Sequence, residues 1–369
     1  MGKKLRVGII GAGMIAQSGH IPAYRKFPDS IEIAAICGPH ADSVRAVAEK
    51  YSIGKWFLSA QEMLSSCELD IVSICTPNAR HVEDAALALS CGVNVLCEKP
   101  LALTEKDAAN LFAMARAGGL MLAACQTLRF NPEYMAAREA VLAGDLGRVH
   151  FGTCTCVRRR GAPKRGAFLS TELNGGGAMA DIGVHFLDAL LWMMGNPRVV
   201  SVSGSSSNGI LLREKETCYD AKESGSYDSS VILNPTVTEV CDVEDFASGV
   251  IRLEGDASVQ FCIAWNANMP AMRSIRILGD CSGLELPKLS YYGSKAAPLE
   301  DKTPAVAPLT RYADMPFPGH CYLVENVIDH LTRGDPLLIQ PEETVNVTAA
   351  LELFYRSCEE RREVFREKA

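Results

Sequence analysis

The sequence predicts an α/β protein, in which a Rossmann domain precedes an α+β domain with a large, mostly antiparallel open sheet. Three observations support this class. A glycine-rich turn follows an apolar N-terminal strand, strands and helices alternate up to about residue 125, and this alternation ends beyond residue 126. A chain of 369 residues is longer than chains that ordinarily fold around a single hydrophobic core. Two domains are therefore expected, over residues 1–126 and 127–369, with the last helices as candidates to pack back on the first domain.

The glycine-rich turn comes first in the chain. The apolar strand Leu5–Ile10 leads directly into Gly11–Ala16, of sequence G-A-G-M-I-A, and a helix is expected over Ile15–Phe27, ending or kinking near Pro22. In such a turn the first glycine permits the tight bend and the second lets the backbone approach a phosphate. The N-terminus of the following helix attracts an anion through its unpaired N–H groups and its dipole. The turn therefore predicts a dinucleotide site.

The rest of the first domain repeats the strand–helix alternation. Further strands are expected at Ile31–Cys37, Asp70–Cys75, Asn94–Cys97 and Leu120–Cys125, and further helices at Ala41–Tyr51, Ala60–Ser66, Arg80–Cys91 and Glu105–Ala117. Nearly continuous apolar strands separated by helices favour a parallel sheet that is covered on both faces. Ligands of such sheets bind beyond the carboxyl ends of the strands.

The second domain has hairpin signals instead. The clearest elements are helices at Pro132–Ala143 and Ala180–Met194 and strands at Arg148–Val157, Phe246–Leu253, Ser258–Trp265 and Arg273–Leu278. The turn Glu254–Asp256 joins two of these strands and favours antiparallel pairing. Residues 205–240 are rich in Ser, Gly and charge and predict a long loop or insertion. Helices at Tyr322–Thr332 and Glu342–Glu367 are expected to close the chain.

The composition disfavours two classes of main partner, nucleic acids and membranes. The net charge of −7 disfavours nucleic acid or an anionic membrane as the main partner, and no apolar run approaches the roughly 20 residues that span a bilayer. The N-terminus lacks the apolar core of an export signal. The 14 cysteines are scattered and include no C-x-x-C pair, which indicates reduced thiols in a cytoplasmic protein with no metal site.

Two groups of polar residues carry candidate chemistry. Lys99, in Glu98-Lys99-Pro100, ends an apolar strand at the ligand edge, where its ammonium can stabilise a developing alkoxide. Asp181 and His185 are four residues apart on an expected helix and so share one face. Histidine suits proton transfer near neutral pH. The structural alternatives are a solvated turn for the first group, and a helix-terminus carboxylate with a core histidine for the second.

In order and spacing, these motifs resemble the Gfo/Idh/MocA oxidoreductases, which include inositol, glucose–fructose and other sugar dehydrogenases. The resemblance covers essentially the whole chain and is carried by Gly11–Ala16, Thr76-Pro77-Asn78 with His81, Glu98-Lys99-Pro100, Arg129-Phe130-Asn131-Pro132, Gly175–Asp188, Val243-Glu244-Asp245 and Gly334-Asp335-Pro336. It implies hydride transfer between NAD(P) and a secondary alcohol of a sugar, glycoside or cyclitol, with C3 of a glucoside as one candidate. It also implies a homodimer or homotetramer.

The resemblance implies roles for particular residues. Lys99 would orient the substrate hydroxyl, and His185 would be the general acid/base with Asp181 supporting the proton relay. Together with the glycine turn, it gives as expected cofactor contacts Gly11, Gly13, Met14, Ile15, Gly38, His40, Thr76, Pro77, Asn78, His81, Glu98, Lys99 and Arg129. The substrate contacts expected besides the catalytic residues are Asn131, Arg158, His320 and Tyr322, although a solvated loop or apolar packing also explains the last three.

Three questions stay open at this point. Gly38 stands where an acidic residue often binds the ribose of NAD, and no basic residue is placed for a 2′-phosphate, so NAD is favoured and NADP remains an alternative. A second reading is a glycoside-cleaving hydrolase or lyase in which tightly bound NAD oxidises C3 transiently. A third is a non-catalytic NAD(P)-binding sensor, which the Lys99–Asp181–His185 set disfavours.

Overall fold

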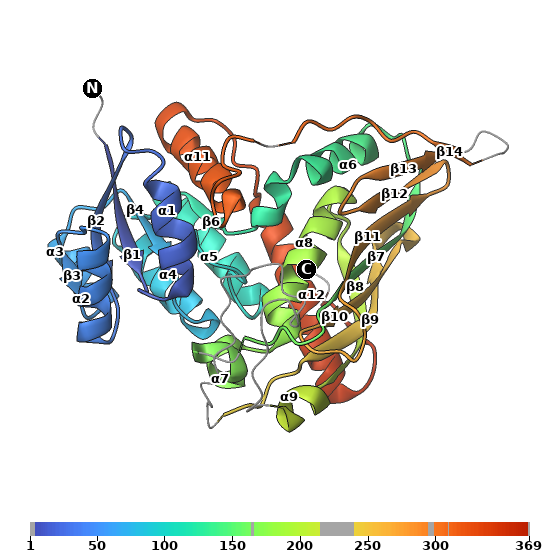
Figure 1. The fold of residues 1–369 in the computed structure, drawn as a ribbon, viewed down its shortest axis with the longest axis horizontal. Coiled ribbons are helices and arrows are strands. Elements are labelled where there is room, and N and C mark those ends of the chain that lie inside the picture. Colours follow the sequence, from blue (N-terminus) through green and yellow to red (C-terminus); the bar gives the residue numbers. More distant parts are fainter. Residues whose placement is uncertain (1–3, 164–165, 215–239, 294–298, 309, 368–369) are drawn as a thin grey trace. The chain divides into compact units, whose positions relative to one another are not determined.

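The computed structural model describes residues 4–163, 166–214, 240–293, 299–308 and 310–367 (Figure 1). The chain forms two compact units. The first comprises Met1–Ala102, Lys106–Phe130 and Leu309–Thr344, and the second comprises Leu103–Glu105, Asn131–Pro308 and Val345–Ala369. The helix expected at Tyr322–Thr332 therefore belongs to the first unit, although it lies far along the chain.

The sheet of the first unit is wholly parallel. Its strands are β1 (Leu5–Ile10), β2 (Ile31–Cys37), β3 (Trp56–Phe57), β4 (Ile71–Ile74), β5 (Asn94–Cys97) and β6 (Leu122–Ala124), in the order β3-β2-β1-β4-β5-β6. The helices α2 (Ala41–Lys50), α3 (Ala60–Ser66), α4 (His81–Ser90) and α5 (Glu105–Gly118) alternate with these strands. The predicted Rossmann class is confirmed. The strand order reverses between β1 and β4, where ligands of this fold bind.

The first helix is shorter and less regular than expected. Instead of one helix over Ile15–Phe27, a π-helical segment, Ala16–His20, passes into α1 (Ile21–Tyr24). Pro22 lies in the first turn of α1, where a missing N–H costs little. Segments of π-helix inside helices are rare and frequently mark functional sites. This one carries the fully buried side chain of His20.

In its described residues, the second unit is built on a sheet of nine strands. They are β7 (Val149–Val157), β8 (Val199–Ser207), β9 (Phe246–Leu253), β10 (Ser258–Ala264), β11 (Met272–Gly279), β12 (Ser282–Leu286), β13 (Ser290–Gly293), β14 (Glu300–Asp301) and β15 (Val364–Phe365). Their order is β14-β13-β12-β11-β7-β10-β9-β8-β15, and among the paired strands only β7 and β10 run parallel. The expected mostly antiparallel sheet is confirmed, as is the hairpin turn Glu254–Asp256 between β9 and β10.

The described helices of the second unit are α6 (Pro132–Leu142), α7 (Thr171–Asn174), α8 (Val184–Met193), α9 (Gly209–Arg213) and most of α12 (Pro341–Glu360). Figure 1 shows α6 and α8 lying against the sheet. The ring of Phe354 in α12 packs edge-on against Phe261 of β10, with 5.6 Å between centroids. The remaining long helix, α11 (Pro318–Arg333), packs on α1 in the first unit.

Two expectations about the second unit were wrong. The last helix does not continue to Glu367: it ends at Glu360, Arg361 takes a left-handed φ of 54°, and β15 then pairs with β8. Residues 205–207 are not loop but the end of β8, paired with β9, and 209–213 form α9. The rest of the expected insertion, 215–239, lies outside the described residues.

Two further observations concern the whole described chain. Among the described helices, none has both the length and the apolar character needed to cross a bilayer. No disulfide joins the cysteines of the described segments.

Candidate active site

The glycine turn leaves its backbone open where a phosphate would lie. Gly11 has a φ of +98°, and a Cβ built on it would lie 2.7 Å from the backbone carbonyl of Cys75, so close packing requires glycine there. A Cβ on Gly13 would meet no atom within 4 Å. The backbone at Gly13 therefore faces open space at the start of the helical segment, which fits a dinucleotide pyrophosphate.

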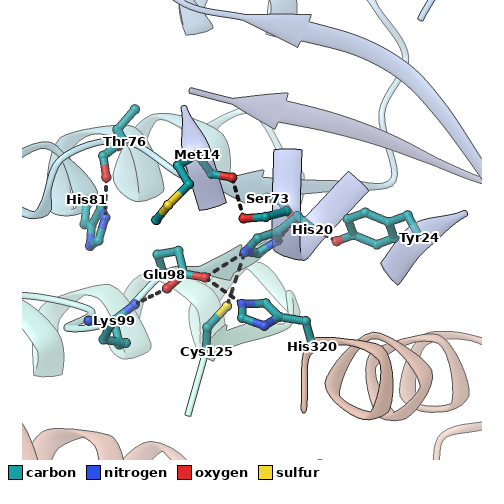
Figure 2. Close-up of polar contacts among 11 residues, drawn as sticks. Met14, His20, Tyr24, Ser73, Thr76, His81, Glu98, Lys99, Cys125 and His320 are labelled. Carbon is teal, nitrogen blue, oxygen red and sulfur yellow. Dashed lines mark hydrogen bonds and ion pairs between the residues drawn. The ribbon is translucent and has the colours of Figure 1, made fainter. Parts of the chain in front are cut away.

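The loop after β4 is held to the loop after β5 by a histidine. The ring of His81 is fully buried, and its Nε2 lies 2.9 Å from the carbonyl oxygen of Thr76 (Figure 2). Its Nδ1 lies 2.8 Å from the carbonyl oxygen of Pro100. Burial lowers the pKa of His81, and the two carbonyl contacts oppose this shift. Thr76 Oγ1 also donates to Asp84 at 2.8 Å. His81 thus fixes the edge of the sheet at which the cofactor is expected.

Glu98 lies buried at the end of β5, with Lys99 half-buried beside it. Its Oε1 accepts hydrogen bonds from Nε2 of His20 at 2.8 Å and from Nε2 of His320 at 3.1 Å. Its Oε2 lies 3.2 Å from the backbone nitrogen of Lys99, which donates to it (Figure 2). Burial opposes ionisation of Glu98, but the hydrogen bonds from the two histidines hold the pKa of this carboxyl well below its usual value.

Sequence reasoning missed His20. Its Nδ1 lies 3.0 Å from Ser73 Oγ, which is 2.7 Å from the hydroxyl oxygen of Tyr24. A polar residue on the buried, otherwise apolar face of the first helix was the signal that could have revealed it. The ligand atoms of His20, Glu98 and His320 lie within 4.8 Å of one another, a spacing that a cation could also use.

Two other predicted residues make structural contacts. Arg129 is 1 % exposed and forms an ion pair with Glu343 at the start of α12. Asn131 caps α6, because its Oδ1 accepts the backbone N–H groups of Glu133 and Tyr134 at 2.9 and 3.4 Å. Their expected roles in binding cofactor or substrate stay predictions.

The remaining expected contacts divide between the units. Gly38 is buried beside Ala12, and His40 is exposed before α2. Tyr322, in the first unit with His320, packs edge-on against Tyr312 at 4.7 Å between centroids. Arg158 belongs to the second unit and is half-buried. Their expected roles in binding cofactor or sugar stay predictions. For His320, the structure shows a hydrogen bond from its Nε2 to Glu98.

In the second unit, Asp181 and His185 stand out by their exposure. Every residue from 176 to 194 is buried except these two, which are both half-buried. Asp181 lies in a π-helical segment, Met179–Gly183, and His185 in the first turn of α8. The indole N–H of Trp265 donates to Asp181 Oδ2 at 3.0 Å. The carboxylate and the imidazole are therefore the polar groups that this helical run leaves accessible.

The N-terminus of this helical run is fully capped. Glu244 accepts the backbone N–H groups of Gly177 and Met179 with its carboxylate, each at 2.8 Å, and that of Ala178 with its carbonyl at 3.0 Å. The hydroxyl of Tyr355 accepts the N–H of Ala180. Burial raises the pKa of Glu244, although these hydrogen bonds oppose the shift. The first N–H groups of a helix have no partner within it, so these contacts fix where the run begins.

The three glycines before this helix allow close packing rather than flexibility. A Cβ on Gly175 would lie 2.4 Å from the Leu103 side chain. On Gly176 it would lie 1.9 Å from the Tyr355 hydroxyl, and on Gly177 1.9 Å from the carbonyl oxygen of Glu244. The glycines therefore admit the groups that cap the helix.

Two family models match two separate parts of the chain. Residues 5–125 match the model of the Gfo/Idh/MocA oxidoreductase family, described as an NAD-binding Rossmann fold, and residues 134–285 match the model of the Gfo/Idh/MocA C-terminal domain. The chain is 34 % identical to D-glucoside 3-dehydrogenase of Escherichia coli (strain K12) over 284 residues, which cover 76 % of this chain and 77 % of that protein.

Solved structures share the fold at lower identity. An oxidoreductase domain protein from Kribbella flavida matches with a TM-score of 0.81 and 22 % identity, over 99 % of this chain and 100 % of the other. Levoglucosan dehydrogenase in complex with NADH matches with a TM-score of 0.80 and 17 % identity, over 98 % and 99 % of the two chains.

Proposed function

The chain belongs to the Gfo/Idh/MocA oxidoreductase family, and from this premise we propose that it transfers hydride between NAD and a secondary alcohol of a sugar or glycoside. The proposal rests on the polar side chains at the two candidate sites. Lys99 follows a buried strand at the ligand edge of a Rossmann sheet, and Asp181 and His185 alone keep partial exposure in the run 176–194. Proton transfer from an alcohol requires groups of this kind, whereas a nucleotide sensor does not.

The first unit would hold the cofactor. The open backbone at Gly13 and the adjoining helical segment would take the pyrophosphate, and the loop Thr76–Asn78 would lie along the nicotinamide ribose. When bound, the nicotinamide supplies the hydride acceptor or donor. The preference for NAD agrees with the matching family model, which is described as an NAD-binding Rossmann fold, although Gly38 offers no carboxylate to a ribose hydroxyl.

Lys99 would bind the reacting hydroxyl. Its ammonium can donate a hydrogen bond to the alcohol oxygen and stabilise negative charge that develops there. Its backbone N–H donates to Glu98 Oε2 at 3.2 Å, which fixes the backbone from which the side chain extends. This lysine would therefore select and polarise one hydroxyl of the sugar.

His185 would be the general acid/base. In the oxidation direction it would take the hydroxyl proton while hydride leaves the same carbon, and in reduction it would return that proton. Asp181, oriented by the Trp265 N–H at 3.0 Å, would bind the substrate and support the charged imidazole. The two residues lie one helical turn apart.

The substrate position that we propose is C3 of a glucoside, supported by the 34 % identity to D-glucoside 3-dehydrogenase. Methyl glucosides carrying an additional methyl ether at C2 or at C3 test this choice, with NADH absorbance as the readout. We expect the C2 ether to be oxidised and the C3 ether to be inert. Oxidation of the C3 ether would contradict the position, and sugar release with no net NADH would favour the glycoside-cleaving alternative. A cytoplasmic location and assembly into a homodimer or homotetramer also stay proposals.

A further inference from the structure

The carboxylate of Glu98 is a buried charge at the ligand edge of the first sheet. The residue is 7 % exposed and directly follows β5, whose carboxyl end faces the ligand side in this fold. Two of its hydrogen-bond donors are imidazole nitrogens, from His20 and His320, and a third is the backbone N–H of Lys99. These contacts tie one carboxylate to the helical segment after the glycine turn, to the loop after β5 and to α11.

One assignment of protons satisfies the contacts around His20. If Nε2–H of His20 donates to Glu98, then Nδ1 accepts the hydroxyl proton of Ser73, and the oxygen of Ser73 accepts that of Tyr24. His20 is neutral in this arrangement, in agreement with the lowering of its pKa by burial. Hydrogen bonds from neutral donors to a carboxylate favour its charged form. The network therefore holds Glu98 as an anion without protonating His20.

A fixed anion at this edge distinguishes the two redox forms of a nicotinamide. The oxidised ring carries a positive charge, and the reduced ring is neutral. Charges interact strongly inside protein, where the effective dielectric constant is well below that of water. A buried carboxylate near the ring therefore stabilises the oxidised form selectively, whereas shape and packing treat the two forms almost alike.

We propose that His20 and His320 are positioning residues that hold Glu98 as a fixed anion beside the Lys99 peptide, and that this anion raises the affinity for NAD⁺ relative to NADH. This inference rests on the proposed function, because it requires the first unit to bind NAD. It assigns to Glu98 an electrostatic action on the cofactor rather than a direct contact with it.

The test is the ratio of dissociation constants for NAD⁺ and NADH, measured by calorimetric titration of the full chain. We expect Glu98→Gln to weaken NAD⁺ binding on the order of tenfold and to leave NADH binding nearly unchanged. Glu62→Gln removes the same charge from the exposed face of α3 and should leave the ratio at its wild-type value. A merely structural role for Glu98 would weaken both forms alike.

A matched pair of variants tests the histidines. Both rings donate through Nε2, a position that a glutamine amide can reach and an asparagine amide cannot. His320→Gln should therefore keep the wild-type ratio, and His320→Asn should shift it in the same direction as Glu98→Gln. If Glu98→Gln does not fold, the His320 pair still decides the matter.

Three results would overturn the inference. Equal weakening of both forms in Glu98→Gln or in His320→Asn would reduce the cluster to a structural element. About one equivalent of tightly bound metal in the wild-type protein, lost in Glu98→Gln, would replace the hydrogen-bonded anion by a metal site. If the wild-type protein binds neither NAD⁺ nor NADH, the proposed function is wrong as well. If it binds both, and the ratio of their dissociation constants is unchanged in the variants, this inference alone is wrong.

Discussion

The hydroxyl of Tyr355 donates a hydrogen bond to Glu244 Oε1 at 3.0 Å and accepts one from the backbone N–H of Ala180 at 3.1 Å. Tyr355 comes from α12 and Glu244 from the segment before β9. Both reach the N-terminus of the helical run that carries Asp181 and His185. The candidate proton-transfer residues are thus placed by contacts from distant parts of the chain.

Removal of the Tyr355 hydroxyl should destabilise the second unit. Tyr355→Phe leaves the N–H of Ala180 without its acceptor and removes one donor from Glu244, so we expect the free energy of unfolding to fall by about 1–2 kcal/mol. Urea unfolding measures this change. Tyr292→Phe, at an exposed position in β13, is the control and should unfold like the wild type. Equal stability of both variants would show that the cap contributes nothing.

Gly13→Ala separates cofactor binding from folding. A Cβ at Gly13 meets no atom of the chain within 4 Å, so the melting temperature should not change. The added methyl group would instead occupy the approach of the pyrophosphate and weaken NAD binding at least several-fold, as calorimetry would show. Gly54→Ala, where a Cβ also meets nothing within 4 Å, should alter neither quantity. Wild-type NAD affinity in Gly13→Ala would place the phosphates elsewhere.

The stability of the first unit should fall in mildly acidic solution. Burial lowers the pKa of His20 and of His81, so the unfolded chain binds protons at a higher pH than the folded one. Their contribution to the free energy of unfolding is therefore complete above the unfolded pKa of about 6.5 and is lost as the pH falls below it. The loss is up to about 1.4 kcal/mol per pH unit for each histidine. Unfolding measured across this range checks the slope.

His20→Gln provides the matched comparison. The amide keeps a donor near Glu98 but does not titrate, so the slope should decrease by the share of one histidine. The pKa of Glu98 lies well below its usual value, so its ionised form contributes to stability above the usual carboxyl pKa. That contribution is lost at lower pH than the contribution of the histidines, as the pH falls from the usual value through the lowered pKa. An acid slope that His20→Gln does not change would mean that His20 is protonated in the folded protein.

Asp181→Asn should slow turnover without loosening the cofactor. The amide oxygen can still accept the Trp265 N–H, but the negative charge beside the proton-transfer site is gone. We expect kcat to fall by about 10²-fold, while the dissociation constant of NAD stays at its wild-type value. Steady-state kinetics and calorimetry test the two parts. Trp265→Phe, which keeps the carboxylate but removes its donor together with part of a buried ring, should have the smaller effect on kcat.

The sequence predicted those features that depend on local pattern. The parallel sheet followed from apolar strands alternating with helices, and the hairpin at Glu254–Asp256 from turn chemistry. Helical spacing predicted one shared face for Asp181 and His185, and the structure leaves both residues half-buried. Each strand, helix and turn behind these predictions is a local pattern, so periodicity and propensity could report it.

Features that depend on long-range contact could not be predicted in this way. The partners of Glu98 lie 78 and 222 positions away in the chain, and no pattern in the sequence joins His20 to His320. The cap of Glu244 and Tyr355 spans 111 positions. The strand β15 was missed because two residues on the edge of a sheet carry no periodicity, and its pairing with β8 appears only in the fold.

We propose that Lys99 and His185 act on the same alcohol in one step. Single-turnover formation of NADH from NAD⁺ and a methyl glucoside, measured for wild type, Lys99→Met, His185→Gln and the double variant, tests it most directly. We expect each single variant to be slower by about 10²-fold or more, with NAD⁺ affinity retained. The double variant should be hardly slower than the slower single one, because residues that act as a unit are not additive. Wild-type rates in either single variant, or losses that multiply in the double variant, would show that Lys99 and His185 do not act together.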